Sequence, residues 1–202
     1  MKILGISASL RNKRFGYKNE LVEDLKKIKN LDGVKSFVNE QIKITFSEIE
    51  NLGKGLSFEE KYKRLKKHKG SRGLSNSEAA LVYALWQSYK NDVDIDYLSL
   101  SNIFENQNKV KIDHFKKKFL SSDALLLSGP VYFGDRGSLT QRMIEFINSD
   151  KECIKHVKKL FYAGLAVGAK RNGGQETTLI FQMTDFLNMG AKVVGNGHDT
   201  TS

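Results

Sequence analysis

Short apolar runs, separated by segments of helical periodicity, are the feature that most constrains the fold of this chain. Residues 124–127, Ala-Leu-Leu-Leu, form a continuous apolar run that is typical of a strand buried on both faces. Four further runs have strand character, at residues 3–7, 93–100, 161–167 and 192–194. Apolar residues at helical spacing occupy the stretches between them. We therefore expect an α/β fold, with a doubly wound, five-stranded parallel sheet and helices on both faces.

The helices expected between these strands are marked by apolar residues on one face. They cover Ser77–Lys90, Ile112–Leu120, a segment capped by Ser138, and a segment around Leu179–Leu187.

Residues from about 17 to 72 differ from the rest of the chain. They are helical by period, and we expect two or three amphipathic helices, although residues 42–46 also alternate as a strand would. Ser57 to Glu60 form a capping-box pattern. Residues 54–72 hold eight Lys or Arg against two Glu, an excess of six in a total net charge of +10. We interpret residues 1–202 as one domain with a basic helical insertion at about 17–72, which would rise near the ligand-binding edge of the sheet as a lid or an oligomer contact.

Composition excludes several classes of protein. The chain has 202 residues and one cysteine, so it cannot by itself form a disulfide, a thiolate zinc site or a cysteine-ligated iron–sulfur cluster. No apolar run approaches the roughly 20 residues that a membrane helix needs. The apolar stretch at the N-terminus is too short and begins too early for a signal peptide. We expect a cytoplasmic protein in a reducing compartment.

Two segments with hydroxyl side chains point to phosphate binding. Ligands of an open doubly wound sheet bind beyond the carboxyl ends of its strands. Ser7 and Ser9 follow the first strand and lead to Arg11, whereas Ser75 and Ser77 precede the helix from residue 77. Hydroxyls, backbone N–H groups and a cation suit a phosphate, although Asn76 or Ser77 capping the helix is the simpler alternative.

The loops after the third and fourth strands suggest a site for a planar ring. Pro130, the only proline, precedes two aromatic residues and Gly134, which permits close approach of a ring to the backbone. In the segment Gly168–Glu176, cations precede two adjacent glycines, Gly173 and Gly174, which lead into a helix. The alternative is an ordinary turn with its aromatics in the core. GxGxxG and GxxxxGK[ST] motifs are absent, which argues against a dinucleotide Rossmann site and a P-loop. The four histidines show no metal-ligand spacing.

Taken together, four segments resemble the NADPH-dependent FMN reductase family, whose members have the flavodoxin-like fold with strand order 2-1-3-4-5. They are KILGISASLR at 2–11, GLSNSE at 73–78, SGPVYFG at 128–134 and AVGAKRNGGQET at 166–177. The chain departs from this family in two ways. About 60 residues separate Arg11 from Ser75, and the cysteine motif of the related iron–sulfur flavoproteins is missing.

The resemblance implies one non-covalent FMN. Its phosphate would be held by Ser7, Ser9, Arg11, Ser75, Asn76 and Ser77. Its isoalloxazine ring would be lined by Pro130, Val131, Tyr132, Phe133 and Gly134. The far side of the ring would be closed, often near a partner subunit, by Gly168, Arg171, Gly173, Gly174 and Gln175.

The function implied is an NAD(P)H-dependent FMN oxidoreductase, in which hydride passes from nicotinamide through flavin to a quinone, a flavin or another small acceptor. No side chain is expected to act as a catalytic residue, because the flavin carries the chemistry. A homodimer or homotetramer is expected. Two alternatives stay open: a flavodoxin-like electron-transfer protein with an acidic redox partner, and nucleic-acid binding through Lys61–Arg72. The second lacks a recognisable nucleic-acid motif.

Overall fold

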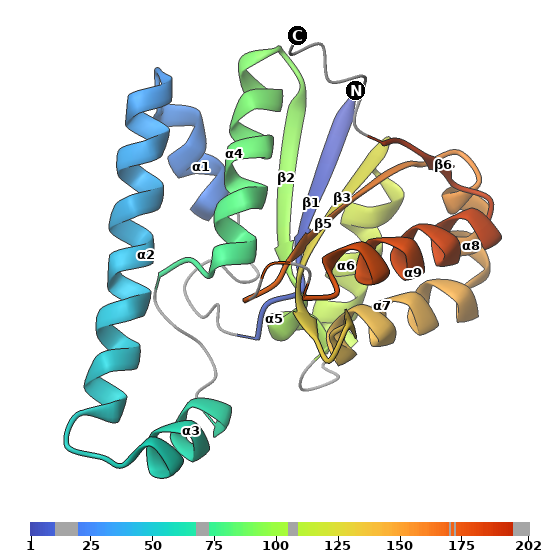
Figure 1. Ribbon diagram of the computed structural model, residues 1–202. Coiled ribbons are helices and arrows are strands. Elements are labelled where there is room, and N and C mark those ends of the chain that lie inside the picture. Colours follow the sequence, from blue (N-terminus) through green and yellow to red (C-terminus); the bar gives the residue numbers. More distant parts are fainter. Residues whose placement is uncertain (11–19, 68–72, 105–108, 170, 172, 196–202) are drawn as a thin grey trace, which may run out of the picture.

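The computed structural model describes residues 1–10, 20–67, 73–104, 109–169, 171 and 173–195 (Figure 1). The strands are β1 (Lys2–Ser7), β2 (Asp94–Ser99), β3 (Ala124–Tyr132), β4 (Asp135–Arg136), β5 (Phe161–Val167) and β6 (Lys192–Val193). The helices are α1 (Glu20–Lys27), α2 (Leu31–Gly53), α3 (Phe58–Lys67), α4 (Asn76–Lys90), α5 (Leu100–Phe104), α6 (Lys109–Leu120), α7 (Ser138–Ser149), α8 (Lys151–Val157) and α9 (Gln175–Asn188).

Five parallel strands form the sheet in the order β2-β1-β3-β5-β6. Counted among the parallel strands alone, this is the predicted order 2-1-3-4-5, and the predicted flavodoxin-like fold is confirmed. The sequence did not predict β4, a two-residue strand that pairs antiparallel with the end of β3. The strand order reverses at β1 and β3, so the loops after these strands lie where ligands bind in such folds.

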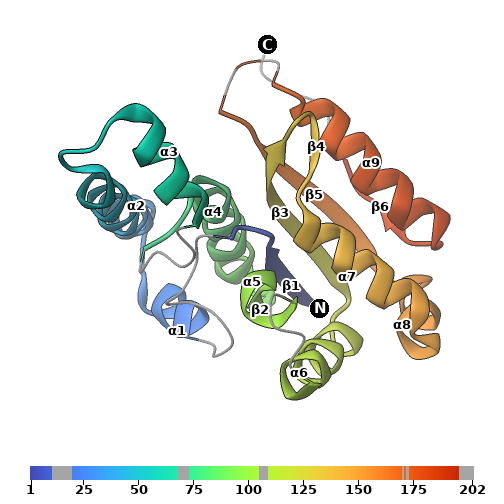
Figure 2. The same cartoon turned by 90° about the horizontal axis from the view of Figure 1, so that it is seen from below.

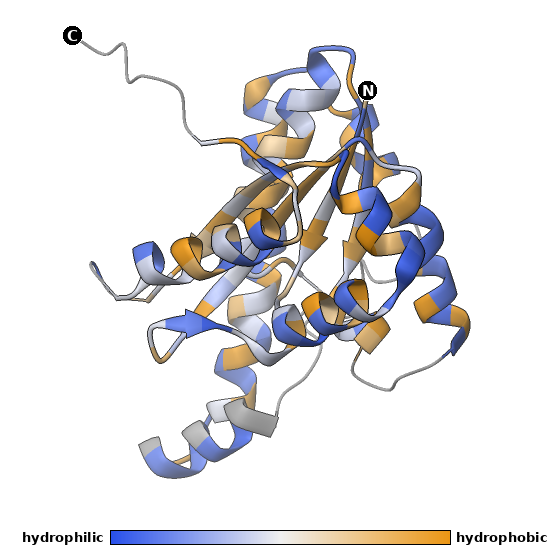
Figure 3. Ribbon diagram, turned by 90° about the vertical axis from the view of Figure 1, so that its right-hand side faces the viewer, coloured by the Kyte–Doolittle hydropathy of each residue, from blue (hydrophilic) through white to orange (hydrophobic). Residues whose placement is uncertain are grey.

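Helices cover both faces of the sheet (Figure 2). On one face α4 packs closely: a Cβ added to Gly5 would lie 2.6 Å from a methyl carbon of Leu85. On the other face α6, α7, α8 and α9 bury the apolar run of β3, and the ring of Tyr162 stacks on Phe186 with centroids 4.0 Å apart. Figure 3 shows hydrophobic positions on the strands and on the helices around them, whereas the coloured positions of α3 are mostly hydrophilic. The apolar runs therefore form a two-faced core, as their continuity predicts.

In the described part of the chain, the three helices α1, α2 and α3 lie between β1 and α4. The prediction that this segment is helical is confirmed. The alternative of a strand at residues 42–46 is wrong, because these residues lie inside α2, which is 23 residues long. Leu21, Leu25 and Val34 are completely buried in one cluster with Leu81 and Leu85 of α4. The inner parts of α1 and α2 are therefore part of the core beside α4.

Several predicted boundaries differ from the structure. The sequence analysis missed α5 and α8, which are five and seven residues long and too short for a helical period to be recognised. The strand predicted at 124–127 continues to Tyr132. Ser138 was predicted to cap α7, but Gly137 is the N-cap and Ser138 is the first helical residue.

Candidate functional site

The first turn of α4 presents serine and asparagine side chains at the carboxyl edge of the sheet. Ser75 is the N-cap residue: its hydroxyl accepts a hydrogen bond from the Glu78 N–H at 3.4 Å, and its own N–H donates to Glu78 Oε2 at 2.8 Å. The capping residue is therefore Ser75 rather than Asn76 or Ser77. Asn76 and Ser77 occupy the first two helical positions, where orphan N–H groups and the helix dipole favour an anion.

A buried carboxylate joins this turn to the end of β1. Glu78 is fully buried, and its Oε1 accepts hydrogen bonds from the Ser7 hydroxyl at 3.0 Å and the Tyr97 hydroxyl at 2.9 Å. Ser7 itself is fully buried and lies beneath the site. Glu78 was not predicted as a site residue, although the Ser-x-x-Glu spacing of its capping box is visible in the sequence.

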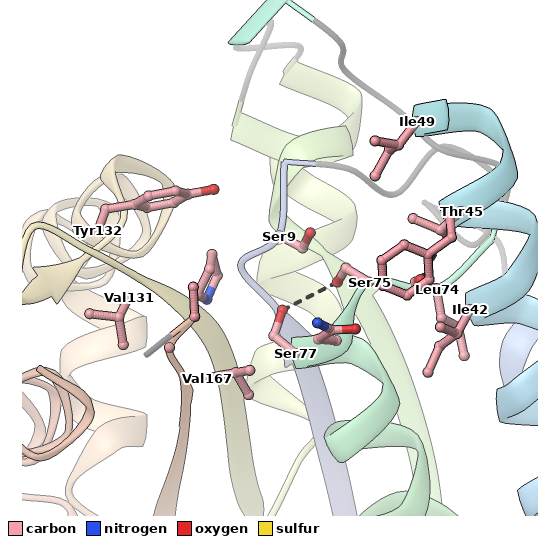
Figure 4. A pocket seen from close by; sticks show the side chains of 15 residues that line it. Ser9, Ile42, Thr45, Ile49, Leu74, Ser75, Ser77, Val131, Tyr132 and Val167 are labelled. Atoms are coloured by element: carbon pink, nitrogen blue, oxygen red, sulfur yellow. Dashed lines mark hydrogen bonds between the residues drawn. The ribbon is translucent and has the colours of Figure 1, made fainter. Parts of the chain in front are cut away.

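One pocket brings residues of all three predicted loops together (Figure 4). It contains these predicted site residues: Ser9, Ser75, Asn76, Ser77, Pro130, Val131, Tyr132 and Gly168. The hydroxyl oxygens of Ser75 and Ser77 lie 3.2 Å apart in the pocket. Segments that are far apart in the sequence thus form one site, with hydroxyls beside α4 and apolar side chains beside β3 and β5.

The second loop is a tight hairpin. β3 ends at Tyr132, and Phe133 and Gly134 have φ angles of 54° and 78° before β4 begins. Positive φ at both central positions is the geometry of a two-residue turn that matches the twist of its strands. Phe133 adopts it although an aromatic residue rarely does, and its side chain is fully exposed. Pro130 lies in β3 beyond the last residue paired with β1, where a missing N–H is tolerated.

The third loop rests directly on this hairpin. Gly174 has a φ of 96°, and a Cβ added to it would lie 2.5 Å from Gly134 Cα. Gln175 Oε1 accepts a hydrogen bond from the Gly173 N–H at 2.7 Å, and its side chain packs against Gly168. These residues hold the two loops together; of the predicted third-loop residues, only Gly168 lines the pocket.

An ion pair fastens the hairpin to α9. Arg136 Nη1 lies 2.9 Å from Asp185 Oδ2, and the same guanidinium donates to Gln141 Oε1 at 2.8 Å. Burial raises the pKa of Asp185, while Arg136 acts in the opposite direction. The hairpin is thereby tied to both α7 and α9.

Not every predicted site residue lies in the pocket. Phe133 and Arg171 are exposed at its margins, and Gly134, Gly173, Gly174 and Gln175 shape the adjoining loops. Arg11 lies outside the described residues.

The fourth wall of the pocket comes from α2, which the sequence analysis did not assign to the site. Ile42, Thr45, Phe46 and Ile49 line it from one face of the helix. Their helical spacing is visible in the sequence, but only the fold shows that this face meets the serine residues of α4.

Cys153 and His156 do not line this pocket. Cys153 is buried in the core, and burial raises the pKa of its thiol to about 12. His156 contacts the Ser122 carbonyl at 2.9 Å and the ring of Phe119. Within the part of the chain that the structure describes, no group of His, Cys, Asp and Glu could hold a metal ion. Its helices also include none that is both long and apolar enough to cross a bilayer.

The donor set fits the phosphate and ring of a flavin nucleotide. Hydroxyl and amide groups at the positive end of α4 suit a phosphate, and Pro130, Val131 and Tyr132 suit the edge of a flat apolar ring. The serine residues of α4 and the end of β3 line the same pocket, as a ligand with both a phosphate and a ring would require.

Comparison with known proteins agrees with this fold. Over 91 residues the chain is 33% identical to the iron-sulfur flavoprotein MJ1083 of Methanocaldococcus jannaschii, a match covering 45% of this chain and 46% of that protein. A flavone reductase structure aligns at a TM-score of 0.50 with 12% identity, covering 96% of this chain and 52% of its own. A structure of RosB with bound 8-demethyl-8-formylriboflavin-5'-phosphate aligns at a TM-score of 0.50 with 10% identity, covering 98% and 67%. No protein-family model matches the chain.

The fold and the pocket define a flavodoxin-like α/β protein with a pocket at the switch point of its sheet. The predicted resemblance is confirmed: the chain is similar to flavodoxin-like flavoproteins in fold and, over part of its length, in sequence. The match spans about half the length of the curated relative. That relative is an iron-sulfur flavoprotein, whereas these 202 residues contain a single cysteine.

Proposed function

We propose that this chain is a flavin-dependent oxidoreductase that binds FMN non-covalently and accepts hydride from NAD(P)H. The proposal rests on the pocket in which the serine residues of α4 and the ends of β3 and β5 come together. A bound flavin would supply the redox chemistry, taking up hydride from a nicotinamide and releasing electrons to a quinone, a flavin or another small acceptor.

The side chains of this pocket would bind and orient the cofactor. Ser9, Ser75, Asn76 and Ser77 would donate hydrogen bonds to the phosphate, supported by the dipole of α4. Pro130, Val131 and Tyr132 would lie against the ring and keep water from it. Gly174 and Gln175 would keep the third loop against the hairpin.

Two further properties belong to this proposal. A cytoplasmic location suits the single, buried cysteine. Self-association suits α9, whose Ile180, Phe181 and Leu187 are 55%, 43% and 56% exposed. Sedimentation of the purified protein tests this second property directly, and a monomer at micromolar concentration would contradict it.

The function is tested by purifying the protein and recording its visible absorption before and after NADPH or NADH is added anaerobically. We expect flavin absorption that bleaches. Flavin absorption that neither nicotinamide reduces would favour the electron-transfer alternative, whereas failure to take up FMN on reconstitution would contradict flavin binding.

A further inference from the structure

The hairpin formed by β3 and β4 is too short to hold its position by its own hydrogen bonds. Two residue pairs join its strands, Val131 with Arg136 and Tyr132 with Asp135. A two-stranded hairpin by itself is at best marginally stable in water. Contacts with the rest of the molecule must therefore fix where the residues of this hairpin lie.

The two faces of the hairpin have different surroundings. Side chains alternate between the faces along a strand, and directly paired residues share a face. Tyr132 and Arg136 therefore point to opposite sides of the hairpin. Tyr132 lines the pocket, and its ring reaches over it in Figure 4. The guanidinium of Arg136 instead contacts side chains of α7 and α9, so one face of the hairpin forms a wall of the pocket and the other anchors it.

Arg136 connects the hairpin to two helices at once. Its Nη1 lies 2.9 Å from Asp185 Oδ2 of α9, while its Nη2 and Nε donate to Gln141 Oε1 of α7 at 2.8 Å and 3.2 Å. The side chains of Arg136 and Asp185 are only 15% and 27% exposed. Because a guanidinium is planar and rigid, partners on both sides of its fork fix its orientation as well as its position.

The residue after Arg136 supports the ring of Tyr132. A Cβ added to Gly137 would lie 3.1 Å from a ring carbon of Tyr132, so this ring packs directly on the backbone. Gly137 is also the N-cap residue of α7, the helix that supplies Gln141. A displacement of Arg136 would therefore move the surface on which the ring of Tyr132 rests.

We propose that Arg136 is a positioning residue of the flavin site: through Asp185 and Gln141 it fixes the hairpin so that Tyr132 lies against the isoalloxazine ring. This inference rests on the proposed function, because it concerns the ring half of the same site. Arg136 is not among the pocket-lining residues and acts through the hairpin. Its loss would weaken contact with the ring and leave the contacts of the phosphate with α4 unchanged.

The test replaces Arg136 by Met, which keeps an unbranched side chain and removes the charge. Riboflavin and FMN share the ring, so the affinity for both should fall by the same factor, about tenfold, the loss expected for one ring contact. The fluorescence of the bound flavin at saturation should rise, because a tyrosine ring that touches a flavin quenches it. Arg136→Lys should restore part of the loss, since an ammonium group can still pair with Asp185.

Lys116→Met is the matched control. Lys116 Nζ lies 2.7 Å from Asp150 Oδ2 in a pair whose side chains are 25% and 22% exposed, and neither residue lines the pocket. This variant should change flavin affinity by less than about twofold. A double-mutant cycle tests whether Arg136 acts through Tyr132: in a protein that already carries Tyr132→Leu, Arg136→Met should have little further effect on riboflavin affinity.

An Arg136→Met protein that is less stable but binds riboflavin as tightly as the wild type, with unchanged flavin fluorescence, would overturn the inference. So would full additivity in the double-mutant cycle. If Arg136→Met does not fold, Asp185→Asn takes its place, because it removes the charge and keeps an acceptor for the guanidinium. Riboflavin affinity should then fall about threefold, and an unchanged affinity would overturn the inference.

Titration of the wild-type protein separates the two proposals. Failure to bind either FMN or riboflavin contradicts the proposed function. Flavin binding that does not respond to the substitutions at Arg136 and Asp185 contradicts only the positioning role of Arg136.

Discussion

The hydroxyl of Ser7, at the end of β1, donates a hydrogen bond to the buried carboxylate of Glu78 in the first turn of α4. The two residues are 71 positions apart in sequence. The same carboxylate accepts a hydrogen bond from the backbone N–H of Ser75. Three helices intervene between the two halves of the proposed phosphate site, and Glu78 holds those halves together.

Replacing Glu78 by Gln should therefore destabilise the protein. The amide nitrogen of Gln cannot accept a hydrogen bond, so at least one of the donors at Ser7, Ser75 and Tyr97 loses its partner. An unsatisfied buried donor costs about 1–3 kcal/mol, and we expect this loss in the free energy of unfolding measured with urea.

The matched control for this variant is Glu60→Gln. Glu60 forms the same capping box at Ser57, where its carboxylate is exposed to solvent. Unfolding midpoints that fall equally in both variants would show that capping, rather than the buried link to Ser7, carries the effect.

The contact between Gly174 and Gly134 predicts a second effect. Gly174→Ala adds a Cβ 2.5 Å from Gly134 Cα and places alanine at a φ of 96°, so the second and third loops must separate. We expect weaker FMN binding in addition to a backbone cost of about 1–2 kcal/mol. Fluorescence titration with FMN and thermal unfolding measure the two effects separately.

Gly190→Ala isolates the backbone cost. Gly190 has a φ of 93°, and the three atoms nearest to its added Cβ all belong to Lys158, which is not among the pocket-lining residues. A loss of FMN affinity in Gly190→Ala as large as in Gly174→Ala would argue against the loop contact.

Adding a negative charge at the first turn of α4 tests whether the phosphate of FMN binds there. Asn76 is exposed at the first position of α4, so Asn76→Asp should leave the helix intact while adding one negative charge there. FMN affinity should fall at least about tenfold through repulsion of the phosphate, whereas riboflavin affinity should stay nearly constant. Ser138→Asp places the same charge at the first position of α7 and should affect neither ligand. Equal losses for FMN and riboflavin would contradict a phosphate at α4.

The side chain of Phe133 is fully exposed and its φ is positive. We therefore expect a substitution there to stabilise the hairpin but to weaken the binding of FMN or NADPH. Phe133→Asn creates an Asn-Gly turn, which favours this geometry, and should stabilise the hairpin by roughly 1 kcal/mol. If the exposed ring contacts the flavin or its substrate, FMN affinity or the KM for NADPH should worsen. A variant that is more stable with both values unchanged would show that the aromatic ring has no part in binding.

Much of the fold could be predicted because the apolar residues of its main strands and helices follow a clear periodic pattern. The apolar run at residues 124–127 and the helical spacing around Leu81 and Leu85 each predict one element, whereas the strand order was predicted from the resemblance to flavodoxin-like proteins. The hairpin was harder to predict, because β3 extends through Pro130 to Tyr132, and Phe133 is an unusual residue at its turn. Local propensity disfavours a proline inside a strand and a phenylalanine with a positive φ. Contacts of β3 with β5 and of β4 with α9 outweigh this local preference.

The site was predictable only in its local parts. A helix cap was expected at Asn76 or Ser77, but the capping residue is their neighbour Ser75. A turn was expected at Pro130, but Pro130 lies in β3 and the turn follows at Phe133 and Gly134. The link from Ser7 to Glu78 joins residues 71 positions apart, and the α2 side of the pocket depends on the close approach of Gly73 to Gln41. No local sequence pattern contains either contact.

The visible absorption spectrum of the FMN-reconstituted protein, recorded anaerobically before and after addition of NADPH or NADH, tests the central claim most directly. Flavin absorption that remains with the protein after gel filtration and bleaches with one of the nicotinamides is the predicted result. A protein that folds but leaves gel filtration without flavin would contradict the account.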